Sequence, residues 1–149
     1  MFLGSFEAAM DAKGRFTLPG NLREKIDENS RRLTITSDPM QDCLLIYTQE
    51  HWSRVLNDLL TKPNADDVIK AFGQILMGSA QDVDIDSNGR LVVPPYLRKT
   101  AGMQKKLFLR GVGTKIELWS EEAHIHAERS RQALLRNPAS RSSLAEISY

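Results

Sequence analysis

The sequence Asp11-Ala12-Lys13-Gly14-Arg15-Phe16-Thr17-Leu18-Pro19 returns in a second copy as Asp86-Ser87-Asn88-Gly89-Arg90-Leu91-Val92-Val93-Pro94. The copies stay in register beyond this motif, because Leu22-Arg23 is matched by Leu97-Arg98. An internal repeat of this kind indicates two related halves arranged about a pseudo-twofold axis. Any surface that one copy forms is therefore expected twice on the molecule.

The same order of sequence patterns follows each copy of the motif. Residues 33–36 and 44–47 have the apolar character of strands, as do residues 107–110 and 116–119. A proline that ends each motif suits the first turn of a helix. Each half is thus predicted to be strand, glycine turn, strand, short helix, hairpin and longer helix, which gives an α+β fold.

Two amphipathic helices are predicted between the halves. Their apolar residues recur at helical spacing and are typical of core or subunit contacts. They are Trp52, Val55, Leu56, Leu59 and Leu60 in the first helix, and Val68, Ile69, Phe72, Ile75 and Leu76 in the second. The predicted organisation is a first repeat over residues 1–60, a linking helix over 61–78, a second repeat over 79–136 and a flexible, polar tail over 137–149.

Composition limits the class of protein. The lone Cys43 favours a reducing cytoplasm, and no apolar run is long enough for a bilayer. The net charge is only +1, but charges segregate, since residues 98–110 and 129–141 hold bases and no acid. A nearly neutral chain can therefore present a basic face. We expect a soluble cytoplasmic protein without a membrane partner.

The repeated motif has the chemistry of a tight turn. The carboxylates of Asp11 and Asp86 can accept backbone N–H groups, and Gly14 and Gly89 can adopt positive φ. Turn formation does not explain the arginine that follows each glycine. That arginine either pairs with the acid of its own turn or projects outward, and its recurrence in both copies favours an outward task.

The chain resembles the MraZ family, within the AbrB-like group of swapped-hairpin transcription factors. The resemblance rests on two Asp-x-x-Gly-Arg motifs each followed by proline, on the Met1-Phe2-Leu3-Gly4 start and on the helical insert. It implies two swapped-hairpin halves, interleaved into one small barrel-like domain with peripheral helices. It also implies a ring-shaped oligomer that binds tandem direct repeats of double-stranded DNA and regulates the bacterial division and cell-wall gene cluster, in association with the nucleoid.

Arginine suits this function because it can contact guanine O6 and N7 with two hydrogen bonds. Lys13 and Arg23 are placed to neutralise phosphates. Asn88 replaces Lys13 in the second copy and acids precede its turn, so the first copy is expected to make more DNA contacts. The candidate DNA-binding residues are Arg15, Lys13, Arg23, Arg90, Asn88 and Arg98.

No enzyme, metal, cofactor or small-molecule substrate is expected. Asp82, Asp84 and Asp86 alternate as in a calcium loop, but the required glycine and glutamate are missing. His124 and His126 would face different ways on a helix. Cys43 and the scattered histidines form no catalytic pattern. Two alternatives to the DNA-reading regulator remain open, namely an oligomeric assembly protein without DNA reading and an antitoxin-type DNA-binding autoregulator.

Overall fold

The structure is a computed structural model that describes residues 1–27, 30–63 and 65–149. The first half contains β1 (Phe2–Ala9), β2 (Arg15–Thr17), α1 (Gly20–Arg23), β3 (Arg32–Ser37), β4 (Leu44–Thr48) and α2 (Gln49–Leu60). The second half contains β5 (Gln81–Asp84), β6 (Arg90–Val92), α4 (Pro95–Thr100), β7 (Lys106–Gly113), β8 (Ile116–Ser120) and α5 (Glu121–Arg136). Helix α3 (Asp67–Gly78) joins them, and short 3-10 helices at Pro138–Ser140 and Ser142–Leu144 follow α5. The α+β class is confirmed.

The halves interleave through their first strands. Six antiparallel strands form one sheet in the order β1-β7-β8-β4-β3-β5. Strand β1 pairs with β7 of the second half, from Phe2 opposite Gly113 to Ala9 opposite Lys106. Strand β5 in turn pairs with β3 of the first half. This exchange confirms the swapped hairpins. The sheet is open rather than a closed barrel, because β1 and β5 are its two edges.

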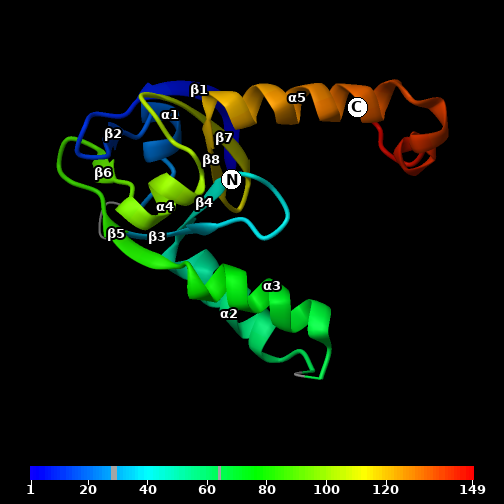
Figure 1. Cartoon of the computed structure of the whole chain (residues 1–149), viewed down its shortest axis with the longest axis horizontal. Coiled ribbons are helices and arrows are strands. Elements are labelled where there is room, and N and C mark those ends of the chain that lie inside the picture. The colour runs from blue at the N-terminus through cyan, green and yellow to red at the C-terminus, as the bar shows by residue number, and fades with distance from the viewer. Residues whose placement is uncertain (28–29, 64) are drawn as a thin grey trace.

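A two-stranded ribbon of β2 and β6 lies outside the sheet, with Phe16 opposite Leu91 at its centre. Alternate side chains of the ribbon and of the residue after each strand point inward, where Phe16, Leu18, Leu91 and Val93 are buried in one core with residues of both halves. The ribbon, α1 and α4 lie together at one end of the molecule (Figure 1). The two halves therefore share their main core, as repeats that cannot bury an apolar face alone are expected to do.

The central strands β4 and β8 are buried on both faces. Leu44 and Ile46 belong to the main core, whereas Leu45 and Tyr47 belong to a second core on the opposite face. This second core receives Trp52 from α2 and Leu76 from α3. Burial raises the pKa of Tyr47 to about 12.

The three longer helices begin at side-chain caps. The Thr48 hydroxyl accepts from the backbone of α2, the Asp66 carboxylate from that of α3, and the Ser120 hydroxyl from that of α5. Helix α5 has no fully buried residue and projects from the sheet (Figure 1). Its anchors include Arg131, which lies 5.2 Å above the Trp119 ring, and Glu128, whose pKa is lowered by a hydrogen bond from Arg110.

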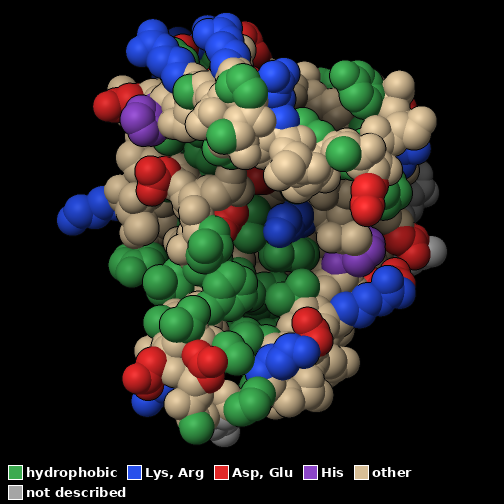
Figure 2. All heavy atoms as spheres, turned by 90° about the vertical axis from the view of Figure 1, so that its right-hand side faces the viewer, with side chains coloured by type: hydrophobic (Ala, Val, Ile, Leu, Met, Phe, Trp, Pro, Cys, Tyr) green, Lys and Arg blue, Asp and Glu red, His purple; other side chains and the backbone are tan. Residues whose placement is uncertain are grey.

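Most apolar residues of the two insert helices stay accessible in the single chain. Trp52 and Leu76 are buried, but Leu60, Val68, Phe72 and Ile75 are between 36% and 78% exposed. In Figure 2, hydrophobic side chains gather on the face that is turned toward the viewer, over the region of α2 and α3 and below α5. A large exposed apolar surface is typical of an interaction site. Among the described residues, no helix has the length and apolar character needed to cross a bilayer.

Candidate nucleic-acid interface

The first motif forms a tight turn between β1 and β2. Asp11 Oδ1 accepts hydrogen bonds from the backbone N–H groups of Lys13 and Arg15, each at 2.9 Å. Gly14 has φ of +83°, a conformation that residues with a side chain rarely adopt. The backbone N–H of Arg15 and then its side chain lower the pKa of Asp11, which favours the carboxylate. Lys13 is exposed at the tip of this turn.

The second motif repeats this geometry. Asp86 Oδ1 accepts from the backbone N–H groups of Asn88 and Arg90, each at 2.9 Å, and Gly89 has φ of +77°. The backbone N–H of Arg90 is the largest cause of the lowered pKa of Asp86. Asn88 is exposed at the position that corresponds to Lys13. The two turns therefore share their backbone and differ in the charge at the tip.

The arginines at the two turns both pair and remain accessible. Arg15 Nε donates to Asp11 Oδ2 at 2.9 Å, and Arg90 Nε donates to Asp86 Oδ2 at 3.1 Å. The side chains are still 42% and 44% exposed, respectively. Within the described residues, the Nη groups of neither arginine form a hydrogen bond with the protein. Each guanidinium is thus oriented through one nitrogen while its outer edge stays available to a ligand.

Each turn is held in place by the other half of the chain. The carbonyl oxygen of Gly89 accepts from Leu18 N at 2.8 Å, and that of Gly14 accepts from Val93 N at 2.8 Å. The ribbon register places Arg15 opposite Val92 and Arg90 opposite Thr17, so the arginines lie toward opposite ends of β2 and β6. Both turns lie at the left edge of the view in Figure 1.

The arginines of the short helices also reach across the halves. Arg23 of α1 donates from Nη1 to the carbonyl oxygen of Asn88 at 3.0 Å. Arg98 of α4 lies over the first turn, where its guanidinium is 2.6 Å from the position that a Cβ on Gly14 would occupy. The structure places each of these arginines beside the turn of the opposite half, because the halves interleave.

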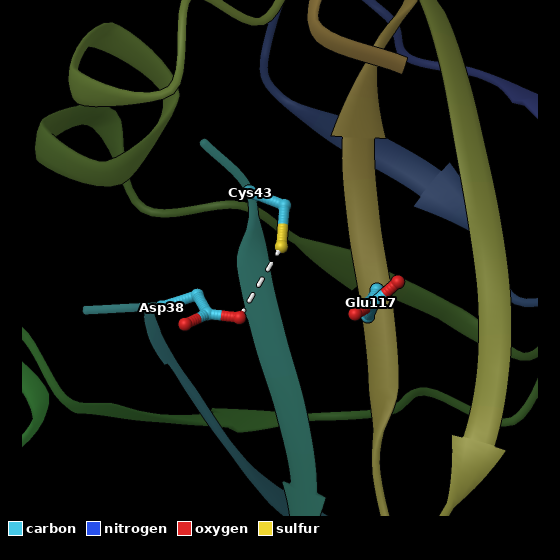
Figure 3. Close-up of side chains that lie close together, drawn as sticks. All are labelled: Asp38, Cys43 and Glu117. Carbon is cyan, nitrogen blue, oxygen red and sulfur yellow. Dashed lines mark hydrogen bonds between the residues drawn. The ribbon is translucent and has the colours of Figure 1, made fainter. Parts of the chain in front are cut away.

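A separate polar cluster is formed by Asp38, Cys43 and Glu117, whose ligand atoms lie within 4.8 Å of one another (Figure 3). These groups already have partners within the chain. The Nε2 amide of Gln41 donates to Asp38 at 2.9 Å and to Glu117 at 2.8 Å, and Cys43 Sγ lies 3.8 Å from Asp38. Burial and then the nearby carboxylates raise the pKa of the Cys43 thiol, which favours its protonated form. The cluster is a hydrogen-bond network beneath α5.

Gly14→Ala is expected to destabilise the protein. A side chain at φ of +83° costs about 1–2 kcal/mol, which lowers the melting temperature by about 2–4 °C per kcal/mol. The matched control is Gly20→Ala, because Gly20 lacks positive φ and no atom lies within 4 Å of its added Cβ. Thermal unfolding of both variants tests the prediction. Equal melting temperatures for the two would contradict the role of Gly14 in the turn.

Comparison with known proteins identifies the family. The family model described as "MraZ protein, putative antitoxin-like" matches residues 1–74 and 76–145. A protein named transcriptional regulator MraZ from Xanthomonas oryzae pv. oryzae is 40% identical over 126 residues, which cover 83% of this chain and 85% of that protein. A protein of the same name from Thioalkalivibrio sulfidiphilus is 37% identical over 126 residues, with 84% and 83% covered. These relatives are named as regulators, not as enzymes. The chain therefore belongs to the MraZ family.

Proposed function

We propose that this chain is a sequence-specific DNA-binding transcriptional regulator that acts in the cytoplasm at the nucleoid. Its target is the bacterial division and cell-wall gene cluster, where it binds tandem direct repeats as a ring-shaped oligomer. The regulatory class is supported by relatives named transcriptional regulator MraZ. The proposed target gene cluster and the proposed tandem DNA repeats are what the family resemblance of the two motifs implies.

The observation that carries the proposal is the pair of accessible arginines fixed at the two turns. Arg15 and Arg90 each donate from Nε to an aspartate, and the part of the chain that the structure describes offers their Nη groups no hydrogen bond. A guanidinium oriented in this way loses less freedom when it binds O6 and N7 of a guanine. A two-stranded ribbon is also a known shape for entering the major groove. The arginines are therefore the proposed base contacts, with Lys13 as a phosphate contact and Asn88 in its place at the second turn.

The proposed oligomer is supported by the apolar face of α3, which we define as Val68, Phe72 and Ile75. These side chains are between 36% and 78% exposed in the single chain. A second copy of the chain is the proposed occupant, and repetition of that contact would close a ring. A ring presents several turns to tandem sites, so contacts after the first become intramolecular. Multivalency would compensate for the net charge of only +1 on each chain.

DNA binding is expected to depend steeply on both salt and repeat number. Each phosphate contact contributes about −0.9 to the slope of log affinity against log salt, and contacts add over the engaged subunits. A duplex with one proposed repeat is expected to bind much more weakly than a duplex with the tandem array, whose position upstream of the gene cluster footprinting would first locate. Fluorescence anisotropy tests both expectations, with a scrambled duplex of equal length as control. Equal affinity for one repeat and for the array would contradict the multivalent ring.

A further inference from the structure

The interleaved halves create two corresponding hollows, one beside each turn. The first hollow has a volume of about 730 Å³ and combines the first turn with α4. It is lined by Met10, Asp11, Ala12, Pro95, Arg98, Lys99, Gly102, Met103, Gln104 and Lys105. The second hollow, of about 390 Å³, combines the second turn with α1. It is lined by Arg23, Glu24, Ile26, Asp27, Arg31, Ile85, Asp86, Ser87 and Gly89.

The two hollows differ in charge. The first contains the cations Arg98, Lys99 and Lys105 with the single acid Asp11. The second contains two arginines with three acids, namely Glu24, Asp27 and Asp86. Glu24 and Lys99 occupy matched positions in the two short helices, since Leu22-Arg23-Glu24 corresponds to Leu97-Arg98-Lys99. The first hollow is thus the better electrostatic partner for an anion.

The cations of the first hollow also lack partners of opposite charge: in residues 1–27, 30–63 and 65–149, none of Lys99, Lys105 and Arg98 forms an ion pair. Lys99 and Lys105 are exposed. Arg98 Nε is buried without a hydrogen-bond acceptor. The arginines of the second hollow are engaged, because Arg23 donates to the carbonyl oxygen of Asn88 and Arg31 to that of Asp86. Arg98 thus has one donor group for which the described part of the chain supplies no acceptor.

We propose that the first hollow binds a phosphate of the DNA backbone through Lys99 and Lys105, with Arg98 as a third donor. This inference rests on the proposed DNA-binding function. The strong DNA contact is then composite, because Arg15 and Lys13 come from the first half and the phosphate ligands come from the second. The second turn lacks an equivalent contact, since Glu24 stands in place of Lys99 and repels phosphate. The charge at these two matched positions, Glu24 and Lys99, thus determines which turn binds the DNA backbone.

Charge reversal at these positions tests the proposal. Lys99→Glu is expected to weaken binding to operator and scrambled duplexes by a similar factor, because a phosphate contact reads no sequence. The log–log salt slope should become shallower by about 0.9 for each phosphate that the variant no longer neutralises. Glu24→Lys is expected to strengthen binding to both duplexes and to steepen the slope. Lys70→Glu, at an exposed position on α3, is the matched control.

The outcomes separate this inference from the proposed function. Lys99→Glu that binds both duplexes as Lys70→Glu does would overturn the phosphate site, even if wild-type protein prefers the operator. Weaker binding confined to operator DNA with an unchanged salt slope would also overturn it, since that pattern indicates a base contact. Wild-type protein that shows no preference for the operator would instead reject the proposed function. Light scattering and circular dichroism verify that each variant assembles and folds.

Discussion

Arg15→Ala is expected to nearly abolish sequence-specific DNA binding while the protein still folds and assembles. A bidentate arginine–guanine contact contributes about 1–3 kcal/mol of discrimination against other bases. The variant loses this contact in every subunit that binds the DNA. The ion pair between Arg15 and Asp11 is exposed, so its removal has little effect on stability. The measurement is the ratio of affinities for the tandem-repeat operator and a scrambled duplex.

Arg90→Ala is the matched control, because the same guanidinium is removed from the corresponding turn. Its effect is expected to be smaller, since Asn88 replaces Lys13 at the tip and Glu24 lies in the adjoining hollow. Arg15→Lys adds a second test, because an ammonium keeps the charge but cannot form the planar bidentate contact. If Arg15→Ala assembles normally and binds the operator as wild type does, the turn does not read DNA, and an assembly protein becomes the better explanation.

The turns could be predicted from the sequence because their chemistry is local. An aspartate that accepts nearby N–H groups and a glycine at positive φ determine the backbone within five residues. The order of helices and strands in each half could also be predicted, since apolar residues at strand spacing and at helical spacing follow one another in the same order in both copies. The resemblance to a known family then supplied the interleaving of the halves, which local patterns alone do not encode.

The partners of each turn could not be predicted, because they depend on long-range pairing. Arg98 contacts the turn at Gly14 only because β1 pairs with β7 and brings the second half across. Lys99 and Lys105 were missed as candidates for the same reason, although both lie in the acid-free stretch 98–110. Apolar residues at helical spacing also give the same sequence pattern whether they pack in the core or contact another subunit. It could not show that Leu76 is buried while Ile75 stays 47% exposed.

Ile75→Glu is expected to convert the oligomer into single chains of 16.8 kDa. Ile75 belongs to the apolar face of α3, where a buried carboxylate without a partner would strongly oppose association. The single chain should keep its fold, because this side chain is already 47% exposed there. Without the ring there is no intramolecular binding, so affinity for the tandem array is expected to fall by about 10²–10⁴-fold. Affinity for a duplex with one repeat should change little, since the turns are remote from α3 (Figure 1).

The control for this variant is Asn57→Glu, which introduces the same charge at an exposed polar position on α2. It should retain both the wild-type mass in light scattering and the wild-type preference for the array. An Ile75→Glu protein that keeps the wild-type mass would show that the α3 face is not the subunit contact. A monomeric Ile75→Glu protein that binds the array as tightly as wild type would show that assembly is not required for reading tandem repeats. The expected result is a coupled decrease of mass and array affinity, because a single chain with a net charge of +1 makes fewer contacts with the array than a ring of several chains does.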